Sequence, residues 1–121
     1  MTADGRPVAI YGDGEQRRDF TYVENVVAAN VVAADTQGVS GAVLNVATGR
    51  PTTVNDLAET IGSLLGRSVE RDEQPERTGD VRDSWADVTR ARELLGWEPR
   101  VGLEEGLRLA AEFLLQRTAL A

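Results

Sequence analysis

The apolar residues of this chain follow two different periods, which predict an alternation of strands and helices. Val8–Tyr11 reads VAIY, a short strand that the glycines of Gly12–Gly14 would end in a tight turn. Valines and alanines then occur nearly all round a helix predicted over 23–36, a pattern typical of a helix buried on more than one face. A continuous apolar run at Ala42–Ala47 predicts a strand buried on both faces of a parallel sheet.

Capping residues predict where the first two helices begin and end. Thr21 and Glu24 have the spacing of a capping box at the start of the first helix. Thr53 is predicted to cap a second helix over 54–65, which carries leucine and isoleucine at helical spacing, and Gly66 is predicted to end it.

The later half of the chain predicts one exposed strand and two more helices. A short charged segment, 68–76, favours a strand with an exposed face. Asp87 is predicted to cap a short helix over 88–95, which Gly96 ends, and a last helix is predicted over 103–116. No internal repeat or linker interrupts these elements, so we expect one ordinary domain with one core.

The composition of the 121-residue chain excludes several kinds of chemistry. It has no cysteine and no histidine, and all 13 of its basic residues are arginine. It therefore supplies no thiol nucleophile, imidazole base, Schiff-base amine, P-loop lysine or Cys-ligated zinc site, and we expect no metal site. The net charge of −7 disfavours nucleic acid and anionic membranes, so any phosphate must be held by a few placed arginines. Without a membrane span or a signal peptide, the chain is expected to be cytoplasmic.

Arg18 is the first candidate for ligand binding. It follows the Gly12–Gly14 turn and precedes the helix predicted at 23–36, whose N-terminal N–H groups add positive potential. Its guanidinium could hold a diphosphate through two parallel N–H donors. The structural alternative is an ion pair of Arg18 with Asp19 or with a more distant acid.

Arg77 and Asp80, which have Gly79 between them, form the second candidate. On a loop, this combination offers a donor fork to phosphate and an acceptor to a sugar hydroxyl. The alternative is a solvated charged run, which the many acids over 70–83 favour equally.

Three linked runs carry a resemblance to a known family. VAIYGDGEQRRDFTYVENVVAANVVAA is followed by LNVATGRPTTVNDLAETIG, and then by PERTGDVRDSWADVTRARELLGWEP with LEEGL. In this order and spacing they resemble the C-terminal part of the extended short-chain dehydrogenase/reductases, most closely UDP-glucose and UDP-N-acetylglucosamine 4-epimerases. The resemblance implies an α/β fold in which residues 1–121 form the nucleotide-sugar-binding portion. It also implies that one helix and one parallel strand would complete a Rossmann sheet in full-length relatives.

The resemblance assigns roles to six residues. Arg18 matches the arginine on the diphosphate, Arg77 matches a second arginine at the phosphate and ribose, and Asp80 matches an acid near the ribose hydroxyls. The strand positions that hold the uracil are matched by Ala9, Ile10 and Tyr11.

The same resemblance limits the expected activity. Family members move a hydride between C4 of the sugar and a tightly held NAD, and a tyrosine transfers the hydroxyl proton. Their glycine-rich dinucleotide loop and Tyr-x-x-x-Lys pair lie in the N-terminal part, and this chain has neither. We therefore expect no catalytic residue and no NAD held by this chain alone.

Several functions remain open at this point. The chain is either the UDP-sugar-binding portion of a 4-epimerase that works with a missing Rossmann lobe, or a non-catalytic UDP-sugar-binding or interaction module. It could equally be the same portion of a dehydratase, decarboxylase or reductase that acts on dTDP- or UDP-sugars. The helix at 23–36 and the strand at Ala42–Ala47 would lose their sheet partner, which favours self-association.

Overall fold

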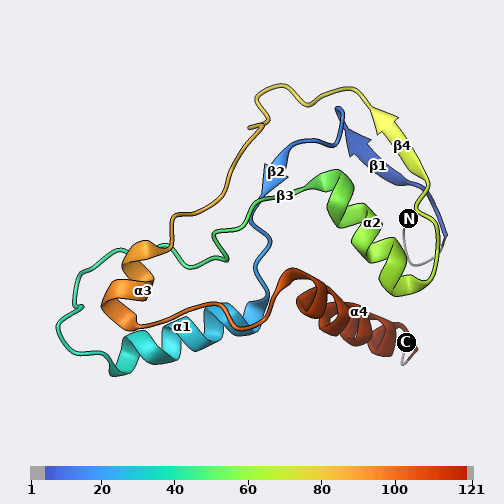
Figure 1. Ribbon diagram of the computed structural model, residues 1–121. Coiled ribbons are helices and arrows are strands. Elements are labelled where there is room, and N and C mark those ends of the chain that lie inside the picture. The colour runs from blue at the N-terminus through green and yellow to red at the C-terminus, as the bar shows by residue number, and fades with distance from the viewer. Residues whose placement is uncertain (1–4, 120–121) are drawn as a thin grey trace. The chain divides into compact units, whose positions relative to one another are not determined.

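The computed structural model describes residues 5–119, which divide into two compact units (Figure 1). Unit 1 comprises residues 5–18 and 51–84, and unit 2 comprises residues 19–50 and 85–119. Among the described residues, the one cluster of buried apolar side chains lies in unit 2, and unit 1 buries Ile10 and Ala58 outside that cluster. Helices together with a small parallel ladder confirm the α/β class.

A two-stranded parallel ladder forms one side of unit 1. β1 (Val8–Tyr11) pairs with β4 (Arg71–Gln74) over its whole length (Figure 1). Ile10 of β1 is only 3% exposed, whereas β4 is mostly exposed. Both strands were predicted, and the exposed character of β4 follows from its charged sequence.

A second pair of very short strands positions Arg18. β2 (Arg17–Arg18) pairs antiparallel with β3 (Thr52–Thr53), and Arg17 also forms a bridge with Asp83. Helix α2 (Val54–Leu65) begins directly after β3, and the Thr53 hydroxyl accepts a hydrogen bond from the Asp56 N–H at 3.0 Å. The predicted cap is therefore confirmed. Arg18 consequently extends from a strand that is fixed to the start of a helix.

The Gly12–Gly14 turn is fastened to the first turn of α2. Gly14 has φ +74°, and a Cβ on it would lie 2.1 Å from Oδ1 of Asn55. The Asn55 N–H donates to the Gly14 carbonyl at 2.9 Å, and its Nδ2 donates to the Asp13 carbonyl at 2.9 Å. Only glycine fits this close approach and this backbone angle.

Unit 2 consists of three helices and irregular segments: α1 (Val23–Asp35), α3 (Thr89–Leu95) and α4 (Leu103–Ala119). Its buried core is formed by Ala29, Ala91 and Trp97. Gly66 and Gly96 end α2 and α3 in the left-handed conformation, as predicted. Asp87 accepts a hydrogen bond from the Thr89 N–H at 2.9 Å, although α3 begins one residue later than expected.

Two predicted features of unit 2 are wrong. Ala42–Ala47 forms no strand, because the described residues provide no neighbouring strand with which this segment could form hydrogen bonds. The capping box is also absent: Tyr22 is the N-cap of α1 and makes no side-chain capping bond. The Thr21 hydroxyl instead donates to Asp19 at 3.4 Å.

Helix α1 has one buried and one exposed apolar face. Asn25 and Ala29 are buried, whereas Val23, Val27 and Val31 are 62%, 53% and 59% exposed. These three valines are spaced four residues apart and therefore form one stripe along the helix. None of the helices over 5–119 is long and apolar enough to cross a membrane.

Candidate functional site

All six residues that the resemblance assigned to ligand binding line one hollow of about 270 Å³ in unit 1. Strand β1 contributes Ala9, Ile10 and Tyr11, and β2 contributes Arg18. The loop after β4 contributes Arg77 and Asp80. The fold thereby brings residues from three separate segments of the chain to one place.

Arg18 is held on several sides. Its Nη2 donates to Oδ1 of Asp80 at 2.8 Å, and its Nη1 donates to the carbonyls of Arg17 at 2.7 Å and Arg82 at 3.1 Å. The pair of Arg18 with Asp80 is the pairing with a distant acid that the structural alternative anticipated; Asp19 is not its partner. Because both side chains are about one third exposed, at 28% and 32%, the pair contributes at most about 1 kcal/mol to stability.

Arg77 and Asp80 are the first and last residues of one turn, and both line the hollow. The Arg77 guanidinium carbon lies 3.8 Å from the centre of the Tyr11 ring, a cation–π contact. The Asp80 N–H donates to the Arg77 carbonyl at 3.2 Å, and Gly79 between them has φ +82°. The turn thus presents a guanidinium and a carboxylate to one small volume.

Two lining residues were missed by the sequence analysis. Gln16 and Val54 also border the hollow, and Gln16 Nε2 donates to the Tyr11 carbonyl at 3.0 Å. Gln16 stands between the glycine turn and Arg18, so its position in the sequence is the only signal that could have found it. Val54 reads as an ordinary helix start.

Asp19, the neighbour of Arg18, belongs to unit 2 and has a structural role there. Its carboxylate accepts from the N–H groups of Thr48 at 2.9 Å, Gly49 at 2.8 Å and Ala86 at 3.3 Å, and from the Thr48 hydroxyl at 2.5 Å. Partial burial acts to raise the pKa of Asp19, but these hydrogen bonds outweigh it and the pKa is lower than usual. Asp19 therefore joins three distant stretches of unit 2.

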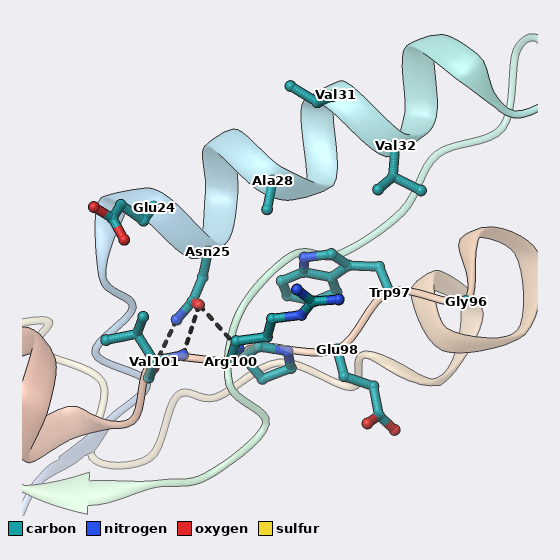
Figure 2. Close-up of a pocket in the computed structure, with 11 residues that line it drawn as sticks. Glu24, Asn25, Ala28, Val31, Val32, Gly96, Trp97, Glu98, Arg100 and Val101 are labelled. Atoms are coloured by element: carbon teal, nitrogen blue, oxygen red, sulfur yellow. Dashed lines mark hydrogen bonds between the residues drawn. The ribbon is translucent and has the colours of Figure 1, made fainter.

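A larger cavity, of about 550 Å³, lies elsewhere, in unit 2. Figure 2 shows Asn25 pointing from α1 toward Arg100 and Val101, with Trp97 beside them. Asn25 donates to the Val101 carbonyl at 2.8 Å and accepts from the N–H groups of Arg100 and Val101. Its side chain is committed to structure, and no predicted site residue lies in this cavity. We place the candidate site in the smaller hollow because two arginines converge there.

Within the part of the chain that the structure describes, no strand leads through a glycine-rich turn into a helix. The Gly12–Gly14 turn leads from β1 into β2 rather than into a helix, and β3 passes into α2 without a glycine-rich turn. A dinucleotide cradle needs such a turn at a helix N-terminus. Within residues 5–119, no group of three or more acidic side chains could hold a metal ion.

The chain belongs to the GDP-mannose 4,6-dehydratase family, whose profile matches residues 1–110. The resemblance to NAD-dependent sugar epimerases and dehydratases is thereby confirmed. UDP-glucose 4-epimerase of Mycolicibacterium smegmatis is 41% identical over 94% of this chain and 36% of its own length.

Solved structures of epimerases share the fold. UDP-glucose 4-epimerase of Thermotoga maritima, determined with UDP-glucose, is 46% identical with a TM-score of 0.87, over 98% of this chain and 37% of that chain. UDP-glucuronic acid 4-epimerase of Bacillus cereus, determined with UDP-glucuronic acid and NAD, is 29% identical with a TM-score of 0.87, over 93% of this chain and 36% of that chain. The chain thus spans about a third of the length of these relatives.

Proposed function

We propose that this chain is the UDP-sugar-binding portion of an NAD-dependent sugar 4-epimerase and cannot catalyse the reaction alone. The observation that carries the proposal is the convergence of Arg18, Arg77 and Asp80 on the hollow beside β1. Arg18 and Arg77 bind the diphosphate, and Asp80 lies near the ribose. The names of the relatives support a UDP-sugar as the ligand.

The free edge of β1 suits the uracil. The N–H groups of Val8 and Gly12 donate toward β4, to the carbonyls of Glu70 and Gln74 at 2.9 Å. Alternate residues of a strand direct their amide groups to opposite edges, so Ala9 and Tyr11 face away from β4. No strand pairs with that edge among the described residues. The Tyr11 carbonyl on this edge accepts from Gln16 Nε2, and the remaining amide groups of Ala9 and Tyr11 can meet the N–H and carbonyl groups of a pyrimidine ring.

A direct binding experiment tests the proposal. Calorimetric titration of the chain with UDP, dTDP and GDP should give submillimolar binding of UDP, and Arg18→Ala should abolish it because the diphosphate loses its main cation. Arg108→Ala is the matched control, since Arg108 pairs with Glu105 on α4 in unit 2 and should leave UDP binding unchanged. Absence of binding for every nucleotide would refute the proposal.

Hydride transfer would require residues other than the binding residues Arg18, Arg77 and Asp80. NAD accepts the hydride when it is bound to an enzyme of this kind. A full epimerase would therefore need a Rossmann lobe, and the exposed valines of α1 are a surface that such a lobe could cover. Mixing the chain with a matching lobe should restore UDP-sugar epimerisation, and no activity at saturating lobe would exclude this arrangement.

The second candidate is a non-catalytic UDP-sugar-binding module. This chain has no lysine and cannot form a Tyr-x-x-x-Lys pair; in the first candidate a Rossmann lobe supplies that pair, and in the second nothing does. UDP binding that persists while every lobe mixture stays inactive would support this function over the first.

A further inference from the structure

The carboxylate of Asp80 lies directly beside the arginine that is proposed to hold the diphosphate. Arg18 Nη1 makes two hydrogen bonds to backbone carbonyls, and Nη2 makes one, at 2.8 Å, to Asp80. An arginine has five N–H donors, and Nε of Arg18 has no hydrogen-bond partner among the described residues. A ligand can therefore share the guanidinium with Asp80 and need not displace it.

The charge balance around this shared guanidinium is tight. The charged residues that line the hollow are two arginines, Arg18 and Arg77, and one acid, Asp80. An adjoining hollow of about 140 Å³, which shares Asp80, is lined by Glu76 and Asp13, and Arg82 pairs with Asp13 at 3.1 Å. Each further negative charge on a ligand consequently meets nearby carboxylates.

We propose that Asp80 is a specificity-determining residue that favours a nucleoside diphosphate esterified to a sugar over the free nucleoside diphosphate. This inference rests on the proposed UDP-sugar binding. A diphosphate esterified at both ends carries one negative charge on each phosphate. The free diphosphate carries an additional charge on its terminal phosphate above a pKa of about 6. Asp80 repels that additional charge.

The expected size of the effect follows from the exposure of the site. A charge placed about 4–6 Å from Asp80, in surroundings close to water, changes an affinity by about three- to tenfold. Loss of a ribose contact would act differently, because both ligands contain the same ribose. It would weaken both affinities by the same factor, so the ratio of the two affinities isolates the charge effect.

The experiment compares UDP with UDP-glucose on the full chain by calorimetry, at about pH 8 so that the terminal phosphate is fully ionised. Asp80→Asn should reduce the preference for UDP-glucose over UDP by about three- to tenfold, and this change should shrink in about 0.5 M salt. Asp80→Glu keeps the charge and should keep the preference. Asp72→Asn on the exposed strand β4 removes one carboxylate away from the hollow and should leave the ratio within about twofold.

The outcomes separate this inference from the proposed function. Binding of both ligands with an unchanged ratio in Asp80→Asn would overturn the role of Asp80 and leave UDP-sugar binding intact. Failure of the unaltered chain to bind either ligand would overturn both. Far-UV circular dichroism of each variant checks that the fold is retained.

Discussion

Replacing Asp19 with asparagine should strongly destabilise unit 2, although the sequence indicated only a possible ion pair of Asp19 with Arg18. The carboxylate accepts hydrogen bonds from Thr48, Gly49 and Ala86, which belong to distant stretches of the chain. The asparagine side chain keeps one acceptor oxygen. In place of the second oxygen it has an NH₂ group, which is a donor and cannot accept from the backbone N–H groups. Hydrogen bonds to a charged group contribute about 1.5–3 kcal/mol each, and two weakened bonds at a partly exposed site give a loss of about 2–4 kcal/mol.

Tryptophan fluorescence during urea unfolding measures this loss in unit 2 alone. Both tryptophans, Trp85 and Trp97, lie in that unit, and Trp97 is only 5% exposed. The midpoint for Asp19→Asn should fall by about 1–2 M urea. Asp87→Asn is the control, because the Asp87 carboxylate accepts hydrogen bonds from Thr89, two residues away on the same stretch, and their loss should cost at most about 1 kcal/mol. Equal midpoints for Asp19→Asn and Asp87→Asn would refute the reasoning.

Three further predictions concern the pH dependence of unit 2, the Gly14 turn and the exposed face of α1. The lowered pKa of Asp19 means that its contribution to stability is present above an unfolded-state pKa of about 3.8 and is lost as the pH falls through its lower folded value. Acid unfolding of unit 2, followed by fluorescence, should therefore depend less on pH in Asp19→Asn than in the unaltered chain. Gly14→Ala should destabilise unit 1 by about 2–4 kcal/mol, through strain at positive φ and contact with Asn55. Gly38→Ala is the control, because Gly38 also has a positive φ but has open space around it. In urea unfolding followed by circular dichroism, it should lose less stability than Gly14→Ala. Val27→Asp should reduce self-association in light scattering at high concentration, because it charges the exposed stripe of α1; an unchanged mass distribution would exclude this face as the contact.

Local signals predicted three helix ends because capping depends on adjacent residues, whereas the capping box predicted at Thr21 and Glu24 did not form. Thr53 caps α2, and Gly66 and Gly96 end their helices, as expected from sequence. The Ala42–Ala47 strand failed for the opposite reason: a strand depends on a partner, and an apolar run does not indicate whether one is present. The same limit applies to β2 and β3, whose pairing of two residues each leaves no periodic pattern to detect.

The candidate site was predictable only in part. Its place between the Gly12–Gly14 turn and a predicted helix N-terminus identified Arg18 as a possible anion ligand but left its partner open, and the structure gives Asp80 rather than Asp19. Arg18 and Asp80 are 62 residues apart, so rules based on neighbouring residues in the sequence cannot predict that they pair. The resemblance supplied what local rules could not, because it placed residues of separate segments in one site. It gave no indication of Gln16, or of the hydrogen bonds around Asp19.

The alternation of the two units along the chain has a consequence for folding. Val8 pairs with Arg71, and residues 19–50 of unit 2 lie between them in the sequence. The two strands can therefore pair only after that whole stretch has been synthesised. Unit 2 likewise needs residues 85–119, which follow the second stretch of unit 1. Neither unit is a continuous segment, so non-local contacts must form before either becomes stable, and such topologies fold slowly. A protease cut within 51–84 would therefore interrupt unit 1 directly and sever the covalent connection between the two stretches of unit 2.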